Sequence, residues 1–473
     1  MQTEDEQIDL YLQGLNASAL RQLVLEASWR DEGLRQKLRI AATAAGKKGL
    51  GPLRKAVKLA TKIEGFLGWG EAGNYANGLE DLAQLLANRI DDGDAALVEL
   101  IEEAISRAED ALQHIDDSGG EVMPAILELR KVHLAACDAL RPDPVALANR
   151  LYDFQMHGEW DTFHDVLPDY VGALGENGLR TYRECVESAW KGLPRLGPEG
   201  HRSGWSSSRF HVEAAMKAIA RHENDFELLV AVHEKNLSSP SAFLSLAKLF
   251  RDAGRDADAL AWVEQGIAAF PEELNHDLLS AAIELHLALG QHADAERLAW
   301  QRFERAPGSE AFFRLMEVAD AIERRETVRV RALDHLWQEV AEDELPERAA
   351  GRNRWEKPLR GSIVSIFLRE GDAEAMWAAF CGGQVDVGLW ERVADVRAKT
   401  RHEEAITLYK RLLPHLVEAG SRSSHYAEAF AIVKKIRALR ETHKQLGMFG
   451  DELAEVRLEW KRKRNFMKML DGL

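Results

Sequence analysis

The sequence predicts an all-α protein, an α-solenoid of antiparallel helix pairs. Three observations support this fold class. Apolar residues recur with helical spacing along nearly all of the 473 residues, no run has the alternation of a strand, and short breaks with glycine or proline separate the helical segments. Helices of roughly 10 to 20 residues joined by short connections are typical of stacked helix hairpins.

The helical spacing is clear in two N-terminal segments. In Ala17–Ala27 an apolar stripe of an amphipathic helix is formed by Leu20, Leu23, Val24 and Ala27. Ala95–Ile115 repeats the pattern with acidic residues in between, and its inward positions are Leu97, Leu100, Ile101, Ile105 and Ala108. We expect such stripes to be buried against neighbouring helices.

The break residues indicate a repeat in the C-terminal half. Ser239 followed by Pro240 is typical of a helix start, because serine caps orphan amides and proline suits the first helical position. Gly254 can end that helix in the left-handed conformation. The pattern then recurs at an offset of 36 residues, and Gly254, Ala259 and Pro271 are followed by Gly290, Ala295 and Pro307.

Residues 240–307 resemble tetratricopeptide repeats. The family pattern of bulky, small and aromatic residues, a turn glycine and a closing proline matches Phe243, Leu246, Ala247, Phe250, Gly254, Ala259 and Pro271. A second copy, Leu279 to Pro307, has His286 and Arg302 at two consensus positions. A third, Leu389 to Val417, keeps Ala405 and Tyr409 but lacks the glycine and the proline.

Four longer segments of the sequence resemble a second family. The segments are Gly68–Leu86, Gly158–Tyr170, Leu237–Arg255 and Lys463–Leu473. They are similar to the helical domain of unknown function that follows the zinc motif in bacterial SWIM zinc-finger proteins, over about Leu15 to Leu473. The resemblance implies a helical-repeat fold and supplies no catalytic residue. The Cys-x-Cys and Cys-x-His pairs of the zinc motif are absent, so its DNA or protein binding is not carried over.

Two stretches read as connections. Pro194–Ser208 is rich in glycine, proline and serine, and Glu344–Gly361 combines proline, glycine and many charges. We therefore expect an N-terminal helical-repeat region at 1–193, a linker at 194–208 and tetratricopeptide-like repeats at 209–343. A linker at 344–361 and C-terminal helical repeats with a basic tip at 362–473 would follow.

Composition and charge narrow the function classes. The net charge of −17 argues against a surface that binds nucleic acid throughout, no run is long and apolar enough for a membrane span, and the acidic start is unlike a secretory signal. We expect a cytoplasmic protein. Charge is uneven: residues 80–143 carry 16 acidic and 5 basic residues, whereas 431–473 carry 11 basic and 6 acidic. These are candidate surfaces for two partners or solvated helix faces.

No motif indicates a metal or a cofactor. The cysteines Cys137, Cys185 and Cys381 are too far apart for a zinc or redox pair. The segment Gly46–Gly51 lacks the Ser/Thr of a phosphate-binding loop and reads as a hinge. His211 and His222 lie three helical turns apart, about 16 Å, which is too far to share one ion.

Two groups of residues are candidate partner contacts. Trp160, Asp161 and His164 lie within one and a half turns of a predicted helix, where a carboxylate could orient the histidine for acid–base chemistry. No nucleophile is identifiable, so packing or a partner contact is favoured. The second group is the basic run Lys461, Arg462, Lys463 and Arg464; another basic stripe is Arg54, Lys58 and Lys62.

The favoured function is a non-enzymatic scaffold or adaptor that binds a protein partner on an extended surface. A nucleic-acid-associated regulatory subunit that uses the basic tip is the alternative, and an enzyme whose pocket is assembled from distant residues is a third class. Neither a catalytic residue nor a cofactor is predicted.

Overall fold

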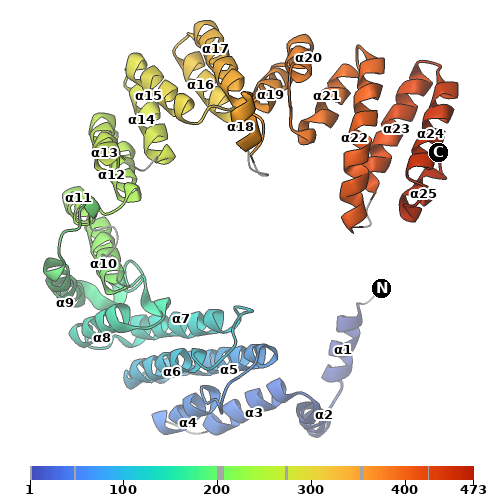
Figure 1. Ribbon diagram of the computed structural model, residues 1–473. Helices are drawn as coiled ribbons and strands as arrows, with labels where there is room; N and C mark the ends of the chain where they lie inside the picture. The colour runs from blue at the N-terminus through green and yellow to red at the C-terminus, as the bar shows by residue number, and fades with distance from the viewer. Residues whose placement is uncertain (1–2, 47–48, 200–206, 272–274, 352–355, 424–425) are drawn as a thin grey trace. The chain divides into compact units, whose positions relative to one another are not determined.

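The chain is all-α, as the sequence predicts. The computed structural model describes residues 3–46, 49–199, 207–271, 275–351, 356–423 and 426–473, and in these ranges it has twenty-five α-helices, two isolated bridges and no strand (Figure 1). Lys47 and Lys48 of the expected hinge lie outside the described residues. No described helix is long and apolar enough to cross a membrane.

The chain divides into two compact units, Met1–Ala242 and Phe243–Leu473. The boundary falls inside helix α12, so the predicted linkers near 200 and 350 lie within the units. The first unit contains α1 (Glu4–Gln13), α2 (Ala17–Arg30), α3 (Glu32–Ala44), α4 (Leu50–Ala60), α5 (Trp69–Ala87), α6 (Ala96–Leu112), α7 (Val122–Leu140), α8 (Pro144–His157), α9 (Val171–Gly192), α10 (Ser207–Glu223) and α11 (Phe226–Glu234), with 3-10 turns η1 (Ile90–Asp92) and η2 (Asp161–Phe163).

The second unit is built from shorter hairpins. Its helices are α12 (Pro240–Asp252), which begins in the first unit, α13 (Asp256–Ala269), α14 (His276–Ala288), α15 (His292–Arg305), α16 (Ser309–Ala321), α17 (Arg325–Asp343), α18 (Pro346–Gly351), α19 (Arg360–Glu370), α20 (Ala373–Cys381), η4 (Val387–Leu389), α21 (Trp390–Arg397), α22 (His402–Ser423), α23 (Ala427–Thr442), α24 (Leu446–Glu459) and α25 (Arg464–Leu470). Successive helices pack against each other, as in α13 with α14 and α21 with α22.

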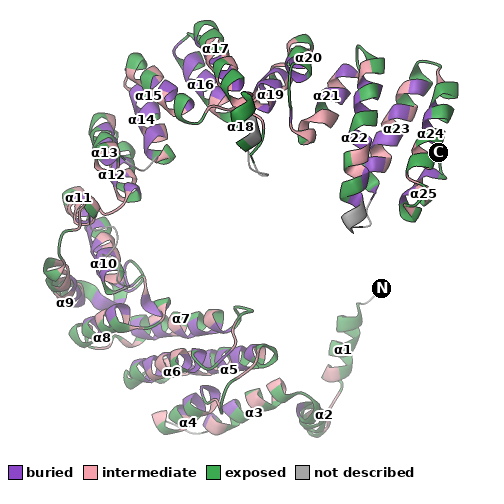
Figure 2. Cartoon of the chain, viewed as in Figure 1, coloured by how far each residue is buried: buried purple, intermediate pink, exposed green. Residues whose placement is uncertain are grey.

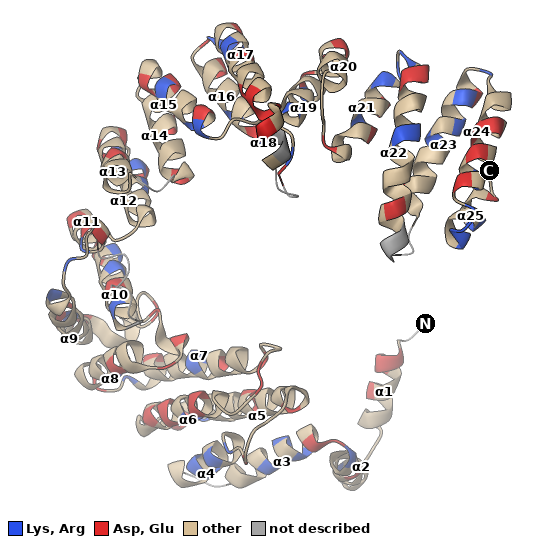
Figure 3. Cartoon of the chain, viewed as in Figure 1, with Lys and Arg blue, Asp and Glu red and all other residues tan. Residues whose placement is uncertain are grey.

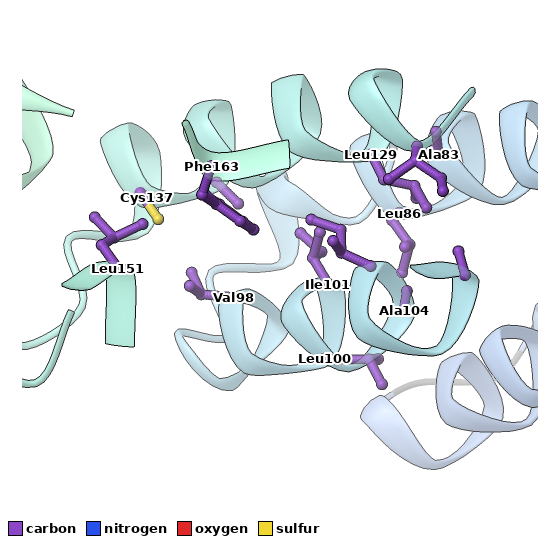
Figure 4. Close-up of a cluster of buried hydrophobic side chains, with 14 of the residues drawn as sticks. Ala83, Leu86, Val98, Leu100, Ile101, Ala104, Leu129, Cys137, Leu151 and Phe163 are labelled. Carbon is purple, nitrogen blue, oxygen red and sulfur yellow. The ribbon is translucent and has the colours of Figure 1, made fainter. Parts of the chain in front are cut away.

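Buried positions lie on the helix faces that meet inside these hairpins, and exposed positions lie on the outer faces (Figure 2). Acidic residues gather on α6 and basic residues on α25, within the acidic and basic stretches of the sequence (Figure 3). In the first unit the core is continuous from α3 to α11. Figure 4 shows part of it, where Ala83 and Leu86 of α5 approach Ile101 and Ala104 of α6 and Leu129 of α7.

The repeat residues have the roles that the spacing predicts. Gly254 and Gly290 adopt left-handed backbone conformations, with φ of 71° and 69°, at the turns after α12 and α14. Ala259 and Ala295 are fully buried where the second helix of each hairpin begins. Gly266 allows close packing, because a Cβ there would lie 2.9 Å from the Cβ of Phe243.

The described parts of the two expected linkers form hydrogen bonds with neighbouring segments. Leu196 exchanges two backbone hydrogen bonds with 235–237, at 3.0 and 2.8 Å, and the Arg209 guanidinium donates to the Pro194 carbonyl at 3.0 Å. In the second stretch, α18 forms and Arg360 makes two hydrogen bonds of 2.6 Å to Glu344. These contacts explain why the unit boundary lies elsewhere; residues 200–206 and 352–355 are outside the described ranges.

Candidate functional site

The candidate site is a groove in the first unit between α10 and the loop that follows η2. We call it the α10 groove; its volume is about 570 Å³. Its lining residues are His164, Asp165, Leu167, Pro168, Phe210, Glu213, Ala214, Lys217, Ala218, Arg221 and His222. A cavity of several hundred Å³ with apolar walls and a few charged groups is typical of a binding site.

One face of α10 forms the floor of the groove. Phe210, Lys217 and Arg221 are spaced by seven and four residues, which places them on the same side of a helix. Phe210 is 47% exposed, a high value for a phenylalanine beside a cavity. The sequence therefore puts one aromatic ring and two cations in line along the groove.

The loop after η2 forms the opposite wall and is held at several points. The imidazole of His164 stacks on the ring of Phe210, with centroids 5.4 Å apart and an angle of 10°. The amide of Gln155 donates to the His164 carbonyl oxygen. Arg130 donates to the Asp165 carbonyl oxygen at 2.8 Å and to the Asp169 carboxylate at 2.7 Å. The wall is thus held by contacts within the protein.

The carboxylates on either side of His164 have different neighbours. The Asp161 carboxylate lies 3.4 Å from Nε2 of His211 on α10, and His164 is 3.9 Å from the exposed Asp165. The expected helix is also absent, because Trp160 is extended and only the 3-10 turn Asp161–Phe163 forms. The Asp161 side chain therefore connects the loop to α10.

Trp160 lies away from the groove, packed against the core of the first unit. Phe163 is buried beside Phe154, with ring centroids 4.8 Å apart, as the packing interpretation predicts. The basic run Lys461–Arg464 lies in the second unit, in the turn before α25 and at its first residue. Sequence reasoning missed Phe210, Lys217 and Arg221, although their helical spacing was available as a signal.

Two cations, Lys217 and Arg221, line the groove. Arg209 neutralises Glu213 through an ion pair of 2.7 Å, whereas neither Lys217 nor Arg221 has an ion-pair partner among the described residues. Burial lowers the pKa of Lys217; the charge of Glu213 opposes this shift and the charge of Arg221 adds to it. Burial, and then the charges of Lys217 and Arg221, lower the pKa of nearby His233 to about 4. The two cations therefore act on a neighbouring buried group.

Within the described residues, no cluster of three or more His, Cys, Asp or Glu side chains has the geometry of a metal site. The groove also contains no serine, threonine, cysteine or tyrosine among its lining residues. Its lining combines the Phe210 ring, two histidines, two carboxylates and the cations of Lys217 and Arg221.

The sequence of residues 9–316 matches the model of a family described as a family of unknown function, DUF6880. The chain belongs to the DUF6880 family. All lining residues of the α10 groove lie inside the matched segment, and the basic run Lys461–Arg464 lies outside it. The resemblance of this DUF6880 protein to the helical region of SWIM zinc-finger proteins stays a prediction. No curated protein sequence matches the chain.

Among solved structures, the DUF6880 chain is similar to the pentatricopeptide repeat protein PPR10 from maize, at 12% identity and a TM-score of 0.26 over 98% of this chain and 69% of that one. It is also similar to Naa15/Naa10 bound to HypK-THB, at 15% identity and a TM-score of 0.21 over 100% and 84%. A circular tandem repeat protein matches at 15% identity and a TM-score of 0.12 over 98% and 96%. TM-scores this low do not support an inference about function.

Proposed function

We propose that this DUF6880 protein is a helical-repeat scaffold whose α10 groove binds an acidic segment of a protein partner. An apolar side chain of that segment would stack on Phe210, and its carboxylates would pair with Lys217 and Arg221. The observation that carries the proposal is the line of an exposed aromatic ring and two unpaired cations along one ordered groove. Aromatic and basic anchors of this kind dominate binding energy at protein interfaces.

The charge of the groove favours an acidic segment over a neutral one. Glu213 is already paired, so the charges left for a partner are those of Lys217 and Arg221, opposed only by the exposed Asp165. Because the ammonium of Lys217 is partly desolvated, its attraction to a carboxylate is stronger than at an open surface. A second charge in line at Arg221 sets the direction in which the segment lies.

We propose further that the groove binds without catalysing a reaction. Support comes from the lining residues, which include no hydroxyl or thiol nucleophile, and from His164, whose ring is stacked on Phe210 and has no carboxylate at hydrogen-bond distance. A carboxylate at that distance would orient a histidine for acid–base catalysis. A stacked ring that completes a binding surface needs none.

The test is direct binding of short fluorescent peptides to the full chain, followed by anisotropy. One peptide carries a phenylalanine among glutamates, a second replaces that phenylalanine by alanine, and a third replaces the glutamates by lysines. We expect measurable binding of the first peptide at low salt, weaker binding of the second, and none of the third. High salt should weaken the first interaction, because screening acts on exposed charges.

Matched charge reversals then locate the site. Lys217→Glu with Arg221→Glu should weaken binding of the acidic peptide by about tenfold or more, which corresponds to ~1.4 kcal/mol. Lys55→Glu with Lys58→Glu, on α4 of the same unit, changes the net charge equally and should leave binding unchanged. Equal losses in both double variants, or no binding to the native chain at low salt, would contradict the proposal.

A further inference from the structure

Helices α1 and α2 present apolar side chains that nothing in the described part of the first unit covers. No residue of α1 is buried, and the only buried residue of α2 is Ser28. Tyr11 is 64% exposed and Trp29 is 69% exposed. Large exposed apolar side chains gathered on adjacent helices mark an interaction surface.

The predicted stripe of α2 gives independent support. Leu23 and Val24 belong to the face that helical spacing assigns to a core, yet they are 43% and 39% exposed. In α6 the same kind of stripe is fully buried against its neighbours. The spacing of these residues predicts a buried face, but the structure exposes that face. The stripe of α2 therefore has the composition of an interface.

Acidic charge surrounds this apolar face. Residues 3–15 contain four acidic and no basic residues, a net charge of −4. Glu4, Asp5 and Asp9 make no ion pair within the described part of the chain. Glu6 is occupied in the capping box, where its carboxylate accepts from the Thr3 amide at 2.9 Å. We call the acidic and apolar side chains of α1 and α2 the acidic face.

The end of α24 and the start of α25 have the opposite charge. Residues 460–473 contain five basic and one acidic residue, a net charge of +4. Lys461, Arg462 and Arg464 are exposed and have no ion-pair partner among the described residues. Leu458, just before them, is 70% exposed. We call Leu458 and Lys461–Arg464 the basic tip.

The backbone of the basic tip is held in place. Phe466 and Leu470 of α25 are fully buried, and Arg457 of α24 donates to the Leu470 carbonyl at 2.9 Å. The charged side chains therefore project from an ordered support. A surface ordered in this way loses less conformational entropy on binding.

We propose that the acidic face of one copy binds the basic tip of a second copy, head to tail. Residues 3–15 and 460–473 have net charges of −4 and +4, and each surface pairs its charge with exposed apolar side chains. Such a contact is heterologous, so each copy keeps one free surface and assembly continues through further copies. Nucleic acid on the basic tip would use Lys461–Arg464 but would leave Leu458 and the acidic face uncovered, which is why the second copy is favoured.

Charge reversal with complementation tests the proposal in the full chain. One variant carries Lys461→Glu, Arg462→Glu and Arg464→Glu; the other carries Glu4→Lys, Asp5→Lys and Asp9→Lys. Glu6 is kept because it caps α1. Sedimentation velocity over a range of concentrations at low salt reports the association state. Circular dichroism checks that both variants keep their helices. We expect no loss of helix, because the replaced side chains are exposed.

The native chain should associate as its concentration rises, and each variant alone should associate about tenfold more weakly or stay monomeric. Mixing the two variants should restore association, because each then supplies a surface complementary to the other. A native chain that stays monomeric at every concentration, or a mixture that stays as dissociated as its components, overturns the proposal. So does a DNA or RNA duplex that binds the native chain, loses binding with the tip variant, and leaves no self-association.

Discussion

The imidazole Nε2 of His133 lies 3.0 Å from the carboxylate of Glu102, and both side chains are almost fully buried, at 0% and 6% exposure. His133 belongs to α7 and Glu102 to α6. The other ring nitrogen, Nδ1, lies 2.9 Å from the hydroxyl of Tyr170, and Arg150 on α8 donates to Glu102 at 2.8 Å. One polar network therefore joins three helices and the residue that precedes α9.

Removing one partner from this network should be costly. Glu102→Ala leaves Arg150 without its closest carboxylate and His133 without a partner on Nε2, and loss of one side of a buried pair typically costs about 3–5 kcal/mol. We expect the midpoint of unfolding to shift to a lower urea concentration, by an amount that corresponds to this loss of free energy. Glu99→Ala is the matched control, since its carboxylate is exposed and lies 3.9 Å from Arg150. Equal effects of the two changes would contradict the network's role.

Gly266 should resist replacement although it lies inside a helix. A Cβ at this position would meet Phe243 at 2.9 Å and Leu278 at 3.1 Å, so Gly266→Ala forces neighbouring side chains apart. We expect a loss of about 1–3 kcal/mol in the free energy of unfolding. In α24 a Cβ at Gly450 meets nothing within 4 Å, so Gly450→Ala should be neutral or stabilise by about 0.5–1 kcal/mol. Thermal denaturation of both variants distinguishes overpacking from helix propensity.

Much of the fold follows from local patterns in the sequence. Gly254 and Gly290 mark helix ends because few other residues adopt their positive φ, and Ala259 lies where a helix crossing leaves no room for a larger side chain. These constraints act within one hairpin, so spacing alone reveals them. The boundary between the two compact units, inside α12, depends on contacts between distant segments, which composition does not reveal.

The buried polar groups were not predictable from spacing. Glu102 is one of the acidic residues between the apolar positions of Ala95–Ile115, and a carboxylate is rarely buried. Its partners His133 and Arg150 are 31 and 48 residues away. The α10 groove is similar. His164 was singled out from its acidic and aromatic neighbours, but its closest ring, Phe210, belongs to a helix more than forty residues later in the chain.

The three cysteines should differ in reactivity towards a maleimide or an aromatic disulfide. Cys381 is exposed, Cys185 is half-buried and Cys137 is fully buried. Burial, with the nearby charge of Glu102, raises the pKa of the Cys137 thiol to about 12, so almost no thiolate is present at neutral pH. We expect Cys381 to react first and Cys137 only after unfolding. Mass spectrometry of partly labelled protein would show a different order if the α6–α7 contact were open.

His233 should make the stability of the first unit depend on pH. Its pKa in the folded chain is about 4, because burial and then the charges of Lys217 and Arg221 disfavour the imidazolium, whereas an unfolded histidine has a pKa of about 6.5. Between these values the unfolded chain binds more protons. The stability that His233 contributes is therefore fully present above about pH 6.5 and is lost as the pH falls towards 4.

From pH 7 to pH 5 the full linkage would be ~2 kcal/mol, and screening by solvent around this partly exposed ring reduces the expected loss to about 1 kcal/mol. Urea unfolding of the native chain and of His233→Gln at the two pH values separates the contribution of His233 from that of the other titrating groups. The variant should lose about 1 kcal/mol less than the native chain. Lys217→Met should reduce the pH dependence in part, because it removes one of the two positive charges that lower the pKa of His233. If the unfolding curves of the native chain and both variants shift by the same amount between the two pH values, His233 is not the group that titrates.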